Sequence, residues 1–295
     1  MAILKTRLLV LGSSGMLGNA IFKFFLSDKN FEVFGSTRSG SNVNFTQEAK
    51  NNLIVGVDPL VDEEKLLSVF ETTKPDVVIN CIGIVKQLKD SQNPLLAIPI
   101  NSLLPHKLAK FCHSIDARLI HISTDCVYSG MKGMYSEQDI SDAVDLYGRT
   151  KFIGEVDYPN AITLRTSTIG HEPNKENRSL VDWFIAQNRP VAGYVNAIFS
   201  GLPCVELAKI IRDFVLPFKN MRGVYHVSAD PISKFELLRM IAQVYNLQTD
   251  IYPDGSVSIN RSLDSSKFSA ATGYKSKKWI DLINQMHNFQ RGNVI

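Results

Sequence analysis

Short apolar runs alternate with stretches of helical periodicity through the first half of the chain. Leu8–Leu11 is an apolar run that ends at Gly12, as expected of a buried strand followed by a tight turn. The residues behind Gly12 repeat their apolar positions at helical spacing and predict a helix with one apolar stripe: Met16, Leu17, Ala20, Ile21, Phe24 and Phe25. Together these residues predict a strand–turn–helix unit.

The same alternation continues to about residue 166. Further β-rich runs predict strands at Phe31–Gly35, Leu53–Val57, Val77–Val85, Leu119–Ser123 and Ala161–Thr166, and helices are expected at Asp62–Thr72 and around Asn101–Ser114. Strands that alternate with helices favour a parallel sheet with helices on both faces. We therefore predict an α/β fold, a Rossmann-like doubly wound parallel sheet.

The second half of the chain is less regular. It predicts helices near Ser179–Gln187, Val205–Phe214 and Ser233–Tyr245, a strand at Val224–Ser228 and a turn-rich stretch at Pro190–Pro203. We expect a first domain over residues 1–167, with a return of the chain to the sheet near 196–215. A smaller, substrate-binding lobe would then cover residues 168–295.

Composition and charge narrow the class of protein. A hydrophobic content of 44% and a charged content of 21% are ordinary for a globular chain. The net charge of +3 is spread along the sequence, so we expect neither a nucleic acid nor a membrane as partner.

The four cysteines show no CxxC spacing, which argues against a zinc site and a disulfide framework, and we expect no metal. Without a signal peptide or a long apolar run, we expect a cytoplasmic protein.

The turn after the first strand carries the glycine spacing of a dinucleotide-binding loop. The segment Gly12-Ser13-Ser14-Gly15-Met16-Leu17-Gly18 follows a strand and opens a helix. There the glycines permit a tight turn, a close approach of backbone N–H groups to a pyrophosphate, and close packing of helix on sheet. We expect five of these residues to contact the cofactor: Gly12, Ser14, Gly15, Met16 and Leu17. The alternative is a glycine-rich turn without a ligand.

The end of the second strand distinguishes between the two pyridine nucleotides. An acidic residue there would bind a free ribose 2′-hydroxyl, but this chain has Ser36, Thr37 and Arg38. A guanidinium with neighbouring hydroxyls suits a 2′-phosphate, so NADP(H) is preferred, with NAD(H) left open. Arg38 could instead be a solvated loop residue. Asp58, after the third strand, could bind the adenine amino group or cap the following helix.

Tyr147 and Lys151 form the most informative pair. Residues four apart share a helix face, so the phenol and the ammonium are expected to be neighbours. A tyrosine ordinarily has a pKa near ~10, and a nearby cation favours its ionised form. Tyr147 could then protonate an oxygen that gains charge during hydride delivery. Thr124, at the end of the fifth strand, could stabilise that oxygen. An ordinary amphipathic helix is the alternative.

With these motifs in place, the chain resembles the extended short-chain dehydrogenases/reductases, and most closely the dTDP-4-dehydrorhamnose reductase branch. The resemblance spans nearly the whole chain. It rests on the glycine loop Gly12–Gly18, Asn80-Cys81-Ile82-Gly83, Ser123–Gly130, Tyr147–Lys151 with Gly154-Glu155, Leu164-Arg165-Thr166, Gly201 and Pro203 with Leu207-Ala208, Gly223-Val224-Tyr225-His226, and Arg261 with Leu263.

The resemblance implies roles for particular residues. It makes Thr124, Tyr147 and Lys151 the catalytic residues and puts Asp125, beside Thr124, with the substrate. Residues 1–167 become an NAD(P)-binding Rossmann domain. In that domain the resemblance adds five cofactor positions: Cys81, Ile82 and Gly83 along the ribose and nicotinamide, Asn101 as a support beneath the site, and Thr166 near the nicotinamide. Tyr147 and Lys151 would also touch the cofactor.

The chain departs from the family pattern at Cys126, where these reductases usually carry tyrosine. Sugar-nucleotide dehydratases have an acidic residue after the Thr-Asp pair, and because position 126 is Cys, dehydration is disfavoured. His121 and His226 lie in apolar strands and are expected to be hydrogen-bonded core residues instead of bases.

The expected function is NADPH-dependent reduction of a 4-keto group on a dTDP- or UDP-linked 6-deoxy sugar, for the deoxysugars of surface polysaccharides. The alternatives are a nucleotide-sugar epimerase that retains its NAD(P), and a non-catalytic NADP-binding regulatory subunit, since the regulatory subunit of methionine adenosyltransferase looks similar to this branch. The expected partner is a nucleotide sugar, with a homodimer as the default assembly.

Overall fold

A computed structural model describes residues 4–39, 45–86, 89–174 and 179–292. The chain divides into two compact units. The first comprises residues 1–123, 145–164 and 220–224, and the second 124–144, 165–219 and 225–295. The units interleave along the chain.

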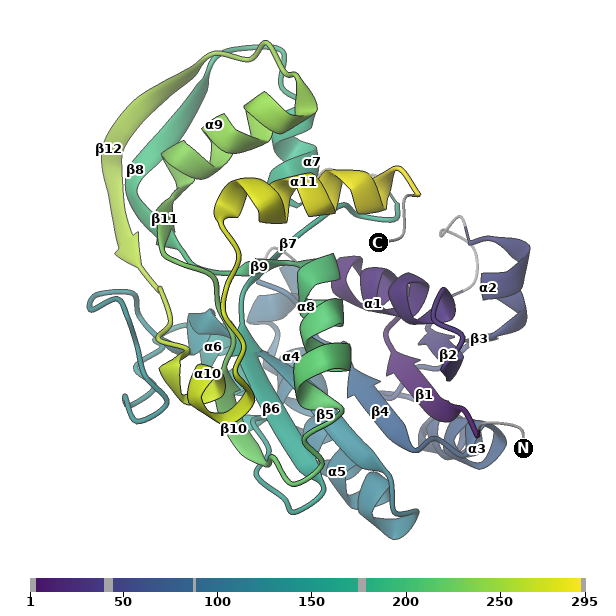
Figure 1. The fold of residues 1–295 in the computed structure, drawn as a ribbon. Helices are drawn as coiled ribbons and strands as arrows, with labels where there is room; N and C mark the ends of the chain where they lie inside the picture. Colours follow the sequence, from purple (N-terminus) through teal and green to yellow (C-terminus); the bar gives the residue numbers. More distant parts are fainter. Residues whose placement is uncertain (1–3, 40–44, 87–88, 175–178, 293–295) are drawn as a thin grey trace. The chain divides into compact units, whose positions relative to one another are not determined.

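The principal sheet has seven strands in the order β10-β6-β5-β4-β1-β2-β3 (Figure 1). Its strands are β1 (Thr6–Leu11), β2 (Phe31–Thr37), β3 (Leu53–Val55), β4 (Val77–Asn80), β5 (Arg118–Thr124), β6 (Ala161–Thr166) and β10 (Gly223–His226). Neighbouring strands from β3 to β5 pair in parallel. The strand order reverses between β1 and β4, which is where doubly wound sheets bind ligands at their carboxyl ends. The predicted Rossmann-like fold is confirmed.

The helices of the first unit follow the strands in the expected alternation. They are α1 (Met16–Leu26), α2 (Gln47–Asn51), α3 (Glu63–Thr73), α4 (Pro94–Ala97), α5 (Leu104–Ser114) and α6 (Leu146–Ile153), with a π-helical turn at Ile98–Leu103 before α5. Side-chain caps begin several of them. Asp62 accepts a hydrogen bond from the Lys65 N–H at α3, and Asp145 accepts one from the Gly148 N–H at α6.

Strand alternation assigns these helices to opposite faces of the sheet. Successive side chains of a strand point to opposite faces. Leu9 of β1 belongs to a buried cluster with Leu66 of α3 and Leu108 of α5. Its neighbour Val10 pairs with Gly35, above which the Phe22 ring of α1 packs so closely that a Cβ on Gly35 would lie 2.9 Å from it. The sheet is therefore covered by α1 on one face and by α3 and α5 on the other.

Gly18 lets the first turn of α1 approach the end of β1. A Cβ on Gly18 would lie 2.2 Å from the carbonyl oxygen of Gly12. Any larger side chain at this position would therefore move the helix away from the loop that precedes it.

The second unit contains a three-stranded sheet in the order β11-β8-β12 and a two-stranded pair, β7 and β9. The strands are β7 (Thr168–Ile169), β8 (Val191–Phe199), β9 (Leu202–Pro203), β11 (Ile232–Ser233) and β12 (Ile251–Asn260). The helices are α7 (Leu180–Ile185), α8 (Cys204–Ile210), α9 (Lys234–Tyr245), α10 (Ser266–Thr272) and α11 (Trp279–Gln290), with a π-helical turn at Ile211–Val215 after α8. The helix α9 packs against β8, and α11 packs against α9.

One expectation for this half of the chain is wrong. The stretch Pro190–Pro203 is mostly the nine-residue strand β8, in which Gly193 makes a close contact, since a Cβ on it would lie 2.6 Å from the Phe235 ring. Strand β8 pairs with β11 and β12, and the strand of this half that joins the large sheet is β10, at Gly223–His226. The return of the chain near 196–215 stays a prediction.

We expect Gly18→Ala to lower the free energy of unfolding by about 1–3 kcal/mol, because the added methyl group would overlap the Gly12 carbonyl oxygen. Urea unfolding followed by circular dichroism measures the change. The matched control is Gly255→Ala, where the nearest atom to the new Cβ would be 3.7 Å away. Equal unfolding midpoints for Gly18→Ala and the unsubstituted protein would contradict the close contact.

Candidate functional site

A cavity of about 250 Å³ opens at the carboxyl ends of β1, β2 and β4, within the first unit. Eight of the residues predicted to bind the cofactor line it: Gly12, Ser14, Gly15, Arg38, Asp58, Cys81, Ile82 and Gly83. They follow the carboxyl ends of four different strands, β1 to β4, so the fold brings together residues that are far apart in the sequence. This is the switch point at which the strand order reverses.

The backbone of this cavity fits a phosphate-bearing ligand. Gly12 has a φ of 82° and turns the chain at the end of β1. A Cβ on Gly15 would meet nothing nearer than the Gly12 carbonyl oxygen, at 3.6 Å, so bare backbone is presented at the amino end of α1. Such an end attracts anions through its N–H groups and the helix dipole. Exposed Arg38 lies at the same cavity, and its recognition of a 2′-phosphate stays a prediction.

The other predicted cofactor residues lie elsewhere. Met16 and Leu17 form the half-buried first turn of α1. Thr166, the last residue of β6, belongs to the second unit, where its hydroxyl donates to the Ser167 carbonyl oxygen at 3.1 Å. Asn101, Tyr147 and Lys151 belong to the first unit.

Beyond Cys81, whose N–H still donates to the Leu11 carbonyl oxygen of β1, side chains hold the backbone that follows β4. Asn80 Oδ1 accepts from the Ile82 N–H at 3.0 Å, and Asn101 binds both backbone groups of Ile84, at 2.9 and 3.1 Å. This explains why the strand ends at Asn80, whereas Val77–Val85 was predicted. Asn101 lies in the π-helical turn Ile98–Leu103, a rare conformation that is frequent at functional sites. The turn thus fixes the loop Cys81–Ile84.

His121 is a buried, neutral residue of β5. The Asn80 amide nitrogen lies 3.1 Å from His121 Nδ1 and can only donate, so Nδ1 accepts and the ring proton is on Nε2. Burial, and then the charge of Lys151, hold the pKa of His121 well below its usual range. Both facts fit a core residue.

Tyr147 and Lys151 lie one turn apart on α6, as their spacing predicted. Tyr147 is half-buried. Lys151 is only 5% exposed, and its Nζ donates to the Ile122 carbonyl oxygen of β5 at 2.8 Å. Burial lowers the pKa of Lys151 to about 8, opposed by the nearby Glu155 and Cys81. The Lys151 ammonium, with a pKa of about 8, therefore lies beside the carboxyl-end half of β5.

Close backbone contact fixes the position of α6. A Cβ on Gly154, which ends the helix, would lie 1.9 Å from the Asn101 carbonyl oxygen. Ser102 Oγ donates to the Thr150 carbonyl oxygen at 2.9 Å, and Asn101 Nδ2 lies 3.4 Å from Thr150 Oγ1. The helix that carries Tyr147 is therefore held against the π-helical turn.

Thr124 and Asp125 belong to the second unit. Thr124 ends β5, and its Oγ1 accepts from the Cys126 N–H and donates to Asp125, both at 3.2 Å. Burial raises the pKa of Asp125, opposed first by the charge of Arg261. The structure defines these local contacts. The convergence of Thr124 with Tyr147 and Lys151 stays a prediction.

Sequence reasoning missed several residues of this region. The cavity wall also contains Asp90, Leu96 and Ile100, which carry no motif of their own. Asn80 was part of the motif Asn80-Cys81-Ile82-Gly83, but its role in holding the Ile82 N–H was not predicted.

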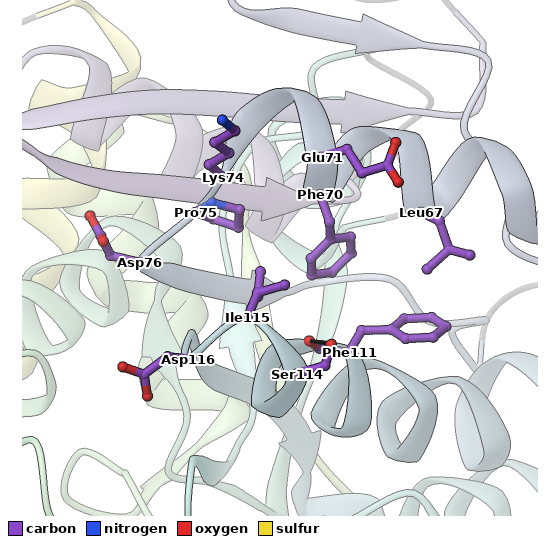
Figure 2. A pocket seen from close by; sticks show the side chains of 10 residues that line it. All are labelled: Leu67, Phe70, Glu71, Lys74, Pro75, Asp76, Phe111, Ser114, Ile115 and Asp116. Carbon is purple, nitrogen blue, oxygen red and sulfur yellow. Dashed lines mark hydrogen bonds between the residues drawn. The ribbon is translucent and has the colours of Figure 1, made fainter.

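A second cavity of the first unit is larger, about 600 Å³, but lies at the opposite ends of the strands. Figure 2 shows Leu67 and Phe70 of α3 opposite Phe111 of α5 and Ile115, with acidic side chains at the rim. The walls come from the last turns of α3 and α5, next to the amino ends of β4 and β5. Ligands of doubly wound sheets bind at the carboxyl ends, so size alone does not make this cavity the functional site.

Metal-ligating clusters and membrane-spanning helices would each indicate another kind of function. Within the described ranges, no group of three or more His, Cys, Asp or Glu side chains is placed to hold a metal ion. No helix in the same part of the chain combines the length and the apolar character that crossing a bilayer requires.

Comparison with known proteins gives consistent matches over nearly the full length. Residues 6–290 match the family model described as RmlD substrate binding domain. A dTDP-4-dehydrorhamnose reductase of Aggregatibacter actinomycetemcomitans is 25% identical over 299 residues, covering 92% of this chain and 95% of the relative. Methionine adenosyltransferase 2 subunit beta of Rattus norvegicus is 30% identical, covering 82% and 72%.

The fold is also similar to solved structures. The crystal structure of dTDP-4-dehydrorhamnose reductase from Bacillus anthracis str. Ames in complex with NADP superposes with a TM-score of 0.79 at 19% identity, covering 97% of this chain and 99% of that chain. At this identity the likeness shows the fold.

We expect Asn101→Ala to release the backbone of Ile84 and to lower the free energy of unfolding by about 1–3 kcal/mol, because two buried hydrogen bonds are lost. Hydrogen exchange measured by mass spectrometry should become faster over Cys81–Ile84. The control is Asn284→Ala on the exposed face of α11, which should leave that peptide unchanged. Unaltered exchange at Ile84 in Asn101→Ala would show that the turn does not fix the loop.

Proposed function

Because this chain belongs to the RmlD substrate binding domain family, within the extended short-chain dehydrogenases/reductases, we propose that it is an NADPH-dependent reductase of nucleotide-linked sugars. The observation that carries the proposal is the pair on α6. Tyr147 and the buried Lys151 lie in the same unit as the glycine-lined cavity, and Lys151 is bound to the carboxyl-end half of β5.

NADP(H) is the proposed cofactor, with NAD(H) as the second choice. When NADP(H) is bound in the cavity lined by the glycine loop, it supplies the hydride. The Ser14 N–H and the amino end of α1, exposed by the turn between Gly12 and Gly15, suit the pyrophosphate, and Arg38 with Ser36 and Thr37 suits the 2′-phosphate. The similar reductase from Bacillus anthracis is in complex with NADP, which supports this choice.

Side chains of α6 and of the end of β5 have separate roles in protonating the ketone oxygen. Tyr147 donates a proton to the ketone oxygen as that oxygen gains negative charge. Lys151, protonated below a pKa of about 8, stabilises the phenolate that remains and binds the ribose. Thr124 Oγ1 would turn its proton from Asp125 to the same ketone oxygen and orient it. Asp125, the next residue in the chain, is proposed to contact the substrate.

The proposed substrate is a 4-keto-6-deoxy sugar linked to dTDP or UDP, and its product would serve surface polysaccharides. The name of the relative from Aggregatibacter actinomycetemcomitans supports a sugar of this class. The residue that follows Asp125 is Cys126, which cannot act as the acid that dehydration requires.

The test of this function is NADPH oxidation, followed at 340 nm, with a panel of dTDP- and UDP-linked 4-keto sugars. We expect turnover with at least one of them. Tyr147→Phe should lower kcat by about 10²–10⁴-fold, because only the general acid is lost, while the affinity for NADPH stays within about threefold. Circular dichroism should show the same fold.

Other outcomes contradict the proposal in different ways. Interconversion of sugar epimers without net NADPH consumption would identify an epimerase. Absence of turnover with the whole panel, together with co-purification of an unrelated enzyme whose activity survives Tyr147→Phe, would indicate a regulatory subunit.

Cofactor preference provides a separate test. We expect Arg38→Ala to raise the KM for NADPH about tenfold or more, because a charge-assisted hydrogen bond to the 2′-phosphate is lost, and to change the KM for NADH by less than about threefold. The control is Arg239→Ala, an exposed arginine paired with Glu236. Equal increases for the two cofactors would mean that Arg38 does not recognise the 2′-phosphate.

A further inference from the structure

We propose that Glu155 is a positioning residue, which holds the Lys151 ammonium against the carboxyl end of β5 through its hydrogen bond with Ser123. The role rests on the proposed function, in which Lys151 assists the proton donor. Glu155 itself would touch neither substrate nor cofactor.

The geometry links two successive residues of β5 to the end of α6. Ser123 Oγ donates to Glu155 Oε1 at 2.6 Å, and the preceding residue, Ile122, accepts from Lys151 Nζ at 2.8 Å. Lys151 and Glu155 are four residues apart, with Glu155 just beyond the end of the helix. Both hydrogen bonds therefore join the end of α6 to β5, at the two residues that immediately precede Thr124.

The backbone around Glu155 leaves little room for adjustment. Gly154 lies against the Asn101 carbonyl oxygen so closely that no Cβ would fit, and the Glu155 N–H donates to the Phe152 carbonyl oxygen at 3.1 Å. The carboxylate is thus presented to Ser123 by a fixed main chain, and its position follows from that of the helix.

The negative charge of Glu155 affects the protonation of Lys151. A buried ammonium tends to lose its proton, and an adjacent carboxylate opposes that loss. Of the groups that act on Lys151, Glu155 has the largest effect in favour of the charged form and Cys81, from the loop after β4, the next largest. Two further titratable groups are Tyr147, one turn earlier on the same helix, and His121 of β5, whose pKa the charge of Lys151 helps to lower.

The decisive measurement is the titration of Lys151 in the full-length protein without cofactor. Carbon-13 NMR of protein labelled at lysine Cε follows each ammonium, and Lys151→Met identifies the resonance of interest. In the unsubstituted protein we expect a midpoint at about pH 8. In Glu155→Gln we expect the midpoint to fall by about one pH unit or more, because the opposing charge is removed.

Two further variants separate the hydrogen bond from the charge. Ser123→Ala retains the carboxylate but frees it from β5, and should lower the midpoint by less than Glu155→Gln does. Glu64→Gln, on the exposed first turn of α3, should leave it unchanged. An unchanged midpoint in Glu155→Gln would overturn the proposal, and an unchanged midpoint in Ser123→Ala would remove its positioning part. If Glu155→Gln fails to fold, Glu155→Asp and Ser123→Ala, which keep a carboxylate but break its hydrogen bond with Ser123, should each lower the midpoint, and an unchanged midpoint in both would overturn the proposal.

Turnover provides the second readout. Because Lys151 is needed charged, activity should fall as the pH rises through its pKa. The alkaline fall of kcat/KM in Glu155→Gln should therefore lie at lower pH than in the unsubstituted protein, with similar rates near pH 6. A uniform loss at every pH would indicate a merely structural role and contradict the proposal. If the unsubstituted protein reduces no sugar, the proposed function fails, while the NMR titration still decides the role of Glu155.

Discussion

The burial of one ammonium constrains the whole arrangement of the site. A charged amine removed from water must be hydrogen-bonded and must have compensating charge close by, or it loses its proton. Lys151 meets both conditions through the Ile122 carbonyl oxygen and Glu155. Each of these contacts requires α6 to lie close to β5, and the direct contact of Gly154 with the π-helical turn makes that approach possible. Helix position, strand end and protonation state therefore depend on one another.

The residues of the candidate site are divided between the two units. The glycine loop, Arg38, Asn101, Tyr147 and Lys151 belong to the first, and Thr124, Asp125 and Thr166 to the second. The first unit thus contains most groups assigned to the cofactor, together with the proton donor, and the second contains Thr166 and the groups assigned to the sugar. Thr124 follows Ser123 directly, so the chain passes from one unit to the other at the end of β5. Ser123 is the last residue of the first unit before this change, and its hydrogen bond with Glu155 stabilises it.

The sequence predicted the features that depend on local pattern. Apolar periodicity located β1, α1 and β6, and the glycine spacing with the Tyr147–Lys151 pair located the cavity and α6. Features that depend on partners far along the chain were missed. The stretch Pro190–Pro203 was predicted to be turn-rich, because Phe235, which packs on Gly193 of β8, follows 42 positions later. The strand β4 is shorter than predicted, because beyond Cys81 the amides of Asn80 and Asn101 bind the backbone of Ile82 and Ile84.

The contact between Gly154 and the Asn101 carbonyl oxygen also bears on how such a sequence can change over time. A substitution at position 154 would be accepted only if residues 98–103 took another path, since main-chain atoms cannot yield as a side chain does. The two segments are therefore expected to diverge together among descendants of this chain, as a covarying pair joined by backbone contact and not by matched side chains.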